Sequence, residues 1–222
     1  MFLTKENKIK WKFLGAALVA VVLLCLAGIL WLDKHIFIFL REFDGLWVRI
    51  FQFAGSSKFW LFASITVFGI AGFLYIMFSK FWIGFSNKAR LLSRISVFVF
   101  ISVLLSGAAT GVLKFVFGRM RPILWEVFGQ TGFYPLNAEW VLNSFPSGHA
   151  TASFAGLVMI GLWFPRLKWA TWTLAVMAGL SRISLGAHWP SDVLLGAFIG
   201  MVTADFVFSI FKRSRRMDFF AN

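Results

Sequence analysis

The residues best suited to chemistry in this sequence stand in segment 181–192, Ser-Arg-Ile-Ser-Leu-Gly-Ala-His-Trp-Pro-Ser-Asp. An arginine, a histidine and a carboxylate are costly to place in an apolar chain, so their proximity indicates one polar site. His188 and Asp192 are four residues apart, and a helix that opens at Trp189-Pro190 brings them together. The carboxylate then holds one ring nitrogen and leaves the other free to react. Taken alone, the segment also fits a turn at the membrane edge with a hydrogen-bonded histidine.

Two further segments combine cations, small residues and a histidine. Residues 114–122 read Lys-Phe-Val-Phe-Gly-Arg-Met-Arg-Pro, and residues 144–149 read Ser-Phe-Pro-Ser-Gly-His. Several cations around a glycine-containing turn that leads into a helix N-terminus suit a multiply charged oxyanion such as phosphate. Arginine matches phosphate oxygens in pairs, which lysine does not. The three segments together therefore predict a phosphate site.

The composition shows which elements must position these residues. The chain has 222 residues, 59% of them hydrophobic and 14% charged, with a mean hydropathy of +0.81. These values are typical of an integral membrane protein and far from those of a soluble domain. The single cysteine, Cys25, excludes an internal disulfide and a cysteine metal site. The net charge of +13 is expected to mark the cytoplasmic face, so we expect no nucleic-acid partner.

Six apolar runs divide the chain, and each is about long enough to cross a bilayer as a helix. They are expected at residues 13–32, 59–78, 95–117, 149–164, 169–186 and 192–211. The first run lacks a small-residue cleavage site, which indicates an uncleaved signal anchor. Residues 33–57 suit a short amphipathic segment at the interface, and residues 118–146 form the longest polar loop. We therefore expect an all-α, polytopic membrane protein of a single domain with six transmembrane helices.

With six spans, both chain termini lie on the same side of the membrane. Most of the 22 Lys and Arg residues fall on that side, in the N-terminal segment, two loops and the tail 212–216. The positive-inside rule then makes both termini cytoplasmic. Segment 33–57, the extracytoplasmic loop 118–146 and the His188 segment are expected to share the opposite face.

Small residues line one face of each of the last four runs. Gly107 and Gly111 share a face with Lys114, and comparable faces of the other three runs carry polar residues of the same segments. Membrane helices approach closely at such faces, so these runs should form a four-helix core, residues 95–211, around the polar site. Alternatively, glycine is simply common in membrane helices. The first two runs lack this pattern and should pack outside the core.

The three segments, in order, resemble the full signature of the type 2 phosphatidic acid phosphatase (PAP2) superfamily: Lys-x6-Arg-Pro, Pro-Ser-Gly-His and Ser-Arg-x5-His-x3-Asp. The matching positions are Lys114, Arg121 and Pro122; Pro146, Ser147, Gly148 and His149; and Ser181, Arg182, His188 and Asp192. The six-span layout agrees with the membrane lipid phosphatase branch of that superfamily. One motif alone would be weak, but three in order on one membrane face are specific.

The resemblance implies a role for each position. His188 would attack phosphorus and form a phosphohistidine, Asp192 would fix its tautomer, and His149 would protonate the leaving oxygen and later activate water. Fixed cations would do the work of magnesium, so no metal and no cofactor are expected. The implied phosphate-binding positions are Lys114, Arg121, Ser147, Gly148, Ser181 and Arg182.

Other polar residues fall outside the signature. Arg119 is either a substrate contact or an ordinary solvated charge. Asp205, deep in the sixth run, is expected to make a buried hydrogen bond, and His35 is assigned no chemistry. The aromatic residues of the long loop either shape an entrance at headgroup level or form an interfacial belt. They are Trp125, Phe128, Phe133, Tyr134, Trp140 and Phe145.

A site flanked by apolar spans favours a phosphate carried on a lipid. The resemblance to the bacterial branch of the superfamily implies undecaprenyl pyrophosphate or a related lipid phosphate, such as phosphatidylglycerol phosphate or phosphatidic acid, and we expect its dephosphorylation on the periplasmic face of a bacterial inner membrane. A lipid A phosphatase or a phosphotransferase would use the same site. A transporter or flippase with an anion-binding core is a more distant alternative, because transport needs no nucleophilic histidine. Vanadium haloperoxidases share the signature but are soluble. The motif spacing does not choose among the lipids, and the sequence leaves the oligomeric state open.

Overall fold

The computed structural model of the protein describes residues 2–4 and 8–214, and the basic positions Lys5, Arg215 and Arg216 lie outside the described residues. The described residues contain helices and no β-strand. The six long helices are α1 Trp11–Ala27, α4 Ser57–Phe78, α5 Ile83–Phe117, α7 Gly148–Trp163, α8 Lys168–Ser184 and α9 Pro190–Ser214. The three short ones are α2 Asp33–Arg41, α3 Leu46–Ala54 and α6 Pro122–Phe128. The chain is all-α, with its long helices at the six expected apolar runs.

Four helical stretches are long and apolar enough to cross a membrane. They are Trp11–Arg41, Ser57–Phe78, Ile83–Phe117 and Pro190–Phe211. Helices α7 and α8 are shorter, with 16 and 17 residues, so each spans only about 25 Å at the helical rise per residue. The protein is therefore a multi-pass membrane protein, and crossing by α7 and α8 to complete six spans stays a prediction.

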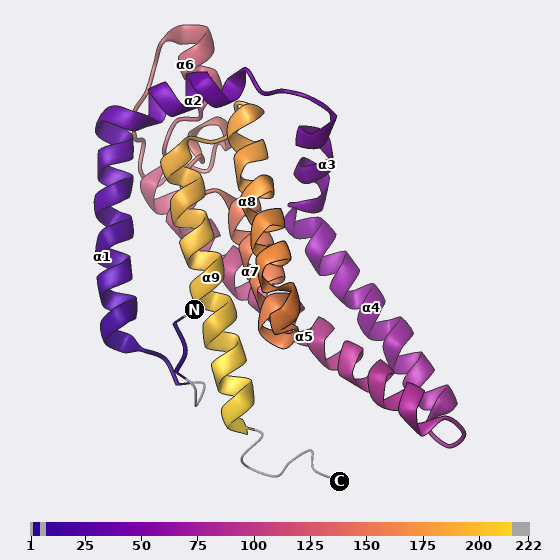
Figure 1. The fold of residues 1–222 in the computed structure, drawn as a ribbon. Helices are drawn as coiled ribbons and strands as arrows, with labels where there is room; N and C mark the ends of the chain where they lie inside the picture. The colour runs from indigo at the N-terminus through magenta and orange to yellow at the C-terminus, as the bar shows by residue number, and fades with distance from the viewer. Residues whose placement is uncertain (1, 5–7, 215–222) are drawn as a thin grey trace.

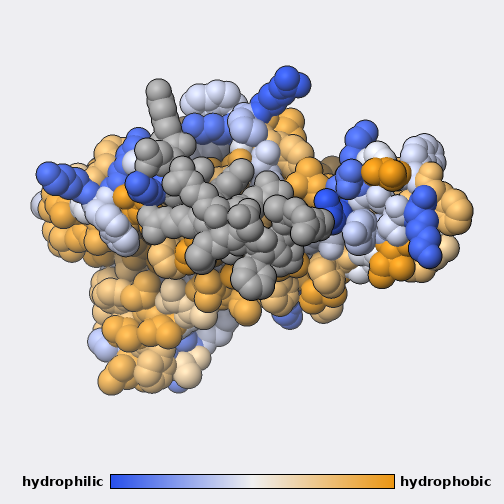
Figure 2. Space-filling view, turned by 90° about the horizontal axis from the view of Figure 1, so that it is seen from below, coloured by the Kyte–Doolittle hydropathy of each residue, from blue (hydrophilic) through white to orange (hydrophobic). Residues whose placement is uncertain are grey.

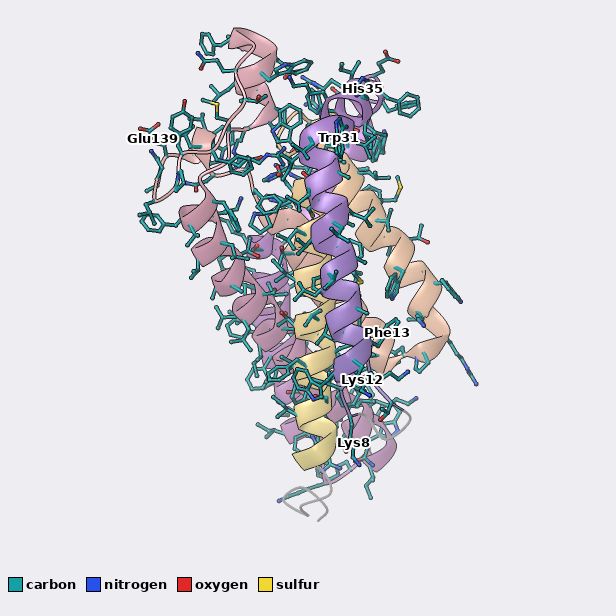
Figure 3. The ribbon with its side chains drawn as sticks, turned by 90° about the vertical axis from the view of Figure 1, so that its left-hand side faces the viewer. Lys8, Lys12, Phe13, Trp31, His35 and Glu139 are labelled. Atoms are coloured by element: carbon teal, nitrogen blue, oxygen red, sulfur yellow. The ribbon has the colours of Figure 1, made fainter. Side chains whose placement is uncertain are left out.

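The two ends of the helix bundle carry different segments. The α4–α5 and α7–α8 turns lie at the same end as the last turns of α9, whereas α2 and α6 lie at the other end (Figure 1). Lys8 and Lys12 lie near the first end, and His35 and Glu139 near the second (Figure 3). Figure 2 looks onto the first end and shows hydrophilic residues around it with hydrophobic surface on the flanks. Loop 118–146 and the α8–α9 turn thus share the second end.

Helices α5, α7, α8 and α9 pack against one another, while α1 lies against α9, and α4 lies against α5 and α7. In the most apolar window of α1 and of α4, only 11% of the residues are buried, against 39% in α5 and 50% in α9. Close packing of α9 requires glycine: a Cβ on Gly196 would stand 2.5 Å from the Ser147 carbonyl oxygen at the start of α7. The helix backbones meet here because no side chain separates them.

The prediction that α5 also packs through a glycine face is wrong. A Cβ on Gly107 or Gly111 would meet no atom within 4 Å. Instead, α5 turns Ser102 and Thr110 toward α7, at 0% and 2% exposure. The Thr110 hydroxyl donates a hydrogen bond to the Thr151 hydroxyl at 3.1 Å. Small hydroxyl side chains, rather than glycines, therefore bring α5 to the core.

The amphipathic segment 33–57 forms two helices. A π-helical turn, Gly28–Leu32, follows α1, and the chain bends so that α2 crosses the end of the bundle (Figure 1). Helix α3 packs beside α8. The wide π turn presents Asp33 toward the bundle, where it is only 3% exposed. The first apolar run thus delivers a buried carboxylate to the end of the bundle that holds the polar motifs.

Candidate active site

The first two motifs are joined by main-chain hydrogen bonds. Gly118 ends α5 in the left-handed conformation, with φ at +57°, and turns the chain toward the long loop. In the next residues, the Arg119 carbonyl accepts a hydrogen bond from the Ser144 N–H, and the Arg121 N–H donates to the Val141 carbonyl, both at 2.9 Å. These bonds set the two arginines beside the segment that opens α7.

His188 lies in the turn between α8 and α9 and is 2% exposed. Its Nδ1 is 3.5 Å from Oδ2 of Asp192 and 3.4 Å from the Ser144 hydroxyl. Its Nε2 is 3.4 Å from Nη1 of Arg121. The Trp189 N–H donates to the same Asp192 oxygen at 2.8 Å, so the start of α9 is fixed against the turn. The carboxylate therefore faces one ring nitrogen, and the other faces the cations.

The electrostatics around His188 favour the neutral imidazole. Burial lowers the pKa of His188 well below its ordinary value, and the charges of Lys114 and Arg121 lower it further. The hydrogen bond with Asp192 opposes these effects without cancelling them. A neutral ring with one unprotonated nitrogen is the form that a nucleophile requires.

Two of the three motif cations are held by backbone carbonyls. Lys114 donates to the Asn143 carbonyl at 2.6 Å and to the Ser144 carbonyl at 3.2 Å. Arg121 donates to the Trp140 carbonyl at 2.8 Å and stacks on the Trp140 ring, 4.1 Å from its centre. Burial lowers the pKa of Arg121 to about 10, although Asp192 acts against this. Arg121 therefore keeps its positive charge at neutral pH.

Arg182, the third cation, is 6% exposed. Its Nε and Nη1 groups are buried and have no hydrogen-bond partner among the described residues. It lies within electrostatic range of both Lys114 and Arg121. A buried guanidinium without an acceptor is costly, so this group is suited to an anion bound between the cations.

His149 is the second residue of α7 and lies among the same cations. Arg182, Arg121 and Lys114 all act on it electrostatically, and the last two also act on His188. Gly148 begins α7, where the first N–H groups of a helix lack partners within the helix. The structure thus brings the three motifs to one place.

The two motif serines have partners of their own. The Ser147 hydroxyl caps α7, accepting from the Ala150 N–H at 3.5 Å. The Ser181 hydroxyl donates to the Ala178 carbonyl at 2.8 Å within α8. Their assignment as phosphate ligands stays a prediction.

The structure assigns Arg119 a partner on each side, and the solvated-charge alternative is wrong. Arg119 is 6% exposed and donates to Asp192 at 2.5 Å and to Asp33 at 2.7 Å. Burial acts to lower the pKa of Arg119, but the two carboxylates outweigh it and the pKa is raised. Sequence reasoning missed Asp33 altogether. The available signal was an acidic residue directly after an apolar run, on the face that also carries Arg119.

Three more residues complete the comparison with the sequence. The Ser144 hydroxyl, which was given no role, donates to Asp192 at 2.5 Å. Asp205 accepts a hydrogen bond from the Phe2 N–H at 2.6 Å, as expected of a buried polar group. His35 is exposed and bonds the Trp31 carbonyl of its own helix at 2.9 Å (Figure 3).

A cavity of about 430 Å³ opens beside the cations. Lys114 and Arg121 line it together with Asn143 and the 62%-exposed Trp140. The aromatic residues of the loop therefore have different surroundings. Trp140 lies at the opening of the cavity, whereas Trp125 packs against the buried Trp189. Gly111 and Phe115 of α5 also line the cavity, so it lies between α5 and two of the three motif cations.

Comparison with known proteins places this site in a family. The lipid A 1-phosphatase of Rhizobium johnstonii is 34% identical over 150 residues, which are 66% of this chain and 59% of that protein. The undecaprenyl-diphosphatase of Sulfolobus acidocaldarius is 32% identical over 108 residues, 48% of this chain and 50% of that protein. The chain thus spans about half to three fifths of the length of these relatives.

Among solved structures, the transmembrane phosphatidylglycerolphosphate phosphatase of Bacillus subtilis shares the fold. Its TM-score is 0.59 at 21% identity, over 93% of this chain and 98% of that one. Residues 95–216 match the family model of the PAP2 superfamily, a region that covers more than half of the chain and contains all three motifs. The chain therefore belongs to the PAP2 superfamily.

Proposed function

We propose that the protein is a metal-independent lipid phosphatase that hydrolyses a phosphate monoester or anhydride through a phosphohistidine at His188. The observation that carries this proposal is Arg182, whose buried Nε and Nη1 have no partner among the described residues. A dianionic phosphate between Arg182, Lys114 and Arg121 supplies the missing acceptor and relieves the repulsion among the three cations.

In the first half-reaction, Nε2 of His188 forms a bond to phosphorus while the bond to the leaving oxygen breaks. His149, protonated when the negative charge of the bound phosphate offsets the three cations, gives its proton to that oxygen. Asp192, beside Nδ1, holds the tautomer whose Nε2 lone pair is free and stabilises the positive ring that forms. In the second half-reaction, His149 takes a proton from water, the water oxygen attacks phosphorus, and the phosphorus–nitrogen bond breaks to release inorganic phosphate.

The three cations stabilise the negative charge on the non-bridging phosphate oxygens in both steps. Metal ions do this in many phosphoryl-transfer enzymes. Here, two of the groups are fixed in advance by backbone carbonyls at Asn143 and Trp140. The Gly148 N–H at the start of α7 adds a further donor.

The cavity and the relatives indicate the substrate. The opening lies against the outer surface of α5, where Phe115 is 46% exposed, so an acyl or prenyl chain can remain in the bilayer while its phosphate reaches the cations. The relatives include lipid A 1-phosphatases and an undecaprenyl-diphosphatase. We therefore propose the lipid A phosphate as the first candidate and undecaprenyl pyrophosphate as the second.

The same proposal includes an orientation. The site lies at the end of the bundle opposite Lys8, Lys12 and the basic α4–α5 turn (Figure 3). Because positive residues tend to face the cytoplasm, this distribution supports our proposal of a site at the periplasmic face of a bacterial inner membrane, with both termini cytoplasmic.

The test is a panel of lipids given to the purified full chain in detergent. Lipid A, undecaprenyl pyrophosphate, phosphatidylglycerol phosphate and phosphatidic acid are each scored for free inorganic phosphate. We expect release from at least one and fastest release from lipid A. Transfer of the phosphoryl group to a second lipid without free phosphate supports a phosphotransferase instead. Absence of both reactions on every lipid overturns the proposal and favours an anion transporter.

A further inference from the structure

The carboxylate next to His188 is one end of a buried chain of charges. Asp192 bonds Arg119, and Arg119 bonds Asp33, at 2.5 Å and 2.7 Å. Ser191 closes the network: its N–H and its hydroxyl donate to the two Asp33 oxygens at 2.9 Å and 2.5 Å, and its hydroxyl accepts from Arg119. None of these residues is more than 6% exposed. The network links α2, the turn after α5, and α9.

Asp33 reaches this network from outside the region that matches the family model, which begins at residue 95. The π turn that precedes it comes close to α9: a Cβ on Gly28 would stand 3.0 Å from the Ser191 Cβ and 3.2 Å from an Asp33 oxygen. At this contact between the π turn and the start of α9, any residue larger than glycine would require the two helices to move slightly apart. This packing holds the second carboxylate in place.

The net charge of the network explains why it contains two carboxylates for one arginine. Asp192 and Arg119 alone form a neutral pair, so Asp192 would have little charge left to stabilise a positive ring at His188. With Asp33, the three groups carry a net charge of −1, and a positive His188 ring, protonated or bonded to phosphorus, balances that charge when the phosphoryl oxygens, which face the cations, are counted separately. Buried ions are tolerated only when they are compensated, so the second carboxylate matters most when His188 is positive.

We propose that Arg119 and Asp33 are positioning residues of the phosphoryl transfer. Arg119 fixes the orientation of Asp192, and Asp33 keeps Arg119 from neutralising Asp192 as positive charge develops on His188. Both act through Asp192. This inference rests on the proposed function, in which His188 is the nucleophile.

Several other charged groups surround His188. Asp192 of α9, Lys114 of α5 and Arg121 of the turn after α5 act on it directly, and His149 of α7 and Arg182 of α8 belong to the same cationic cluster. All of these are expected to contact phosphate, the reacting atoms or His188 itself. Asp33 and Arg119 differ because their only route to the reaction is through Asp192, and their charges have opposite signs. Removing each charge must therefore shift the His188 titration in opposite directions.

The experiment compares Asp33→Asn, Arg119→Gln and the control Glu42→Gln, which removes a charge from an exposed position just after α2. The readout is kcat/KM for phosphate release from lipid as a function of pH. Loss of the Asp33 charge moves the acidic limb to lower pH, and loss of the Arg119 charge moves it to higher pH. We expect kcat to fall at least ~10-fold with KM changed by less than about threefold, and Glu42→Gln to match wild type.

A second measurement does not depend on turnover. Ring ¹⁵N NMR of the full chain follows the titration of His188 in the same variants and gives the same opposite shifts. Shifts in one direction, or shifts no larger than that of Glu42→Gln, overturn the proposal. If Arg119→Gln does not accumulate as folded protein, Asp33→Asn alone decides: no downward shift overturns it. If wild type cleaves none of the lipids, the proposed function fails, while the titration still tests the charge network.

Discussion

Nε2 of His188 and the Arg121 guanidinium face each other at 3.4 Å, on the side of the ring away from Asp192. A fixed cation at this distance disfavours protonation of Nε2 and leaves its lone pair for phosphorus. Once a phosphate is bound, the same guanidinium stands beside the oxygens of the group being transferred. In the proposed mechanism, Arg121 thus both keeps the nucleophile unprotonated and holds the phosphate that it attacks.

Replacing the proposed nucleophile tests the chemistry directly. We expect His188→Gln to lower phosphate release by at least ~10³-fold, because the substitution removes the imidazole that Asp192 orients. Acid-labile radiolabel from a lipid phosphate should be trapped on wild type and not on the variant. His35→Gln is the control, since His35 is exposed and bonds the Trp31 carbonyl of the adjoining π turn, away from the cations. Turnover by His188→Gln near the wild-type rate contradicts the assignment.

Arg182 is expected to lower the stability of the folded protein while serving the reaction. Arg182→Met should abolish detectable phosphate release and raise the thermal midpoint by about 2–4 °C, because it removes a buried charge without a partner among the described residues. Vanadate or inorganic phosphate should raise the midpoint of wild type and leave that of the variant unchanged. An equal ligand-induced rise in both proteins counts against a phosphate at Arg182.

Stability should depend on the protonation of His188. Burial lowers the pKa of His188 in the folded protein. Below about pH 6.5, His188 is therefore protonated in the unfolded chain but still neutral in the folded chain. The contribution of neutral His188 to the free energy of unfolding is complete above that pH and is lost as the pH falls toward the folded-state pKa. We expect the thermal midpoint of wild type to fall more steeply on acidification than that of His188→Gln, by scanning calorimetry in detergent. Parallel curves contradict the lowered pKa.

Removal of divalent metal should leave the activity intact. The three cations are part of the chain, so phosphate release in excess EDTA should stay within about twofold of the untreated rate. Restoration by Mg²⁺ of an activity lost in EDTA is the opposite result, and it would require a metal in the mechanism. The comparison needs enzyme purified without metal-affinity elution buffers that carry over free ions.

The helix contacts can be tested with two matched substitutions. Gly196→Ala should cost about 1–3 kcal/mol, because its Cβ would stand 2.5 Å from the Ser147 carbonyl oxygen. Gly107→Ala should be neutral or stabilising by up to ~1 kcal/mol, because its Cβ meets no atom within 4 Å. Chemical denaturation in detergent measures both. Equal losses would contradict the packing of α9 against α7.

Local patterns were enough to place the long helices and to bring His188 near Asp192, because hydrophobic length acts within one helix and the i, i+4 spacing joins neighbouring residues of a turn and the helix that follows it. The glycine spacing in α5 was misleading: small residues permit close approach, but they do not determine which face of a helix meets another. The bond between Asp33 and Arg119 joins residues 86 apart. It depends on a bend at the π turn 28–32, and no motif in the sequence predicts that bend.

That bend has a practical consequence for anyone who wishes to shorten or graft this protein. A version trimmed to the region that matches the family would keep every signature position yet leave Arg119 with one carboxylate in place of two. Exchanging the first helix for an unrelated anchor would do the same, however well the hybrid inserted. The first helix therefore carries a partner of Arg119, and any shortened or hybrid version has to keep Asp33 or replace its charge.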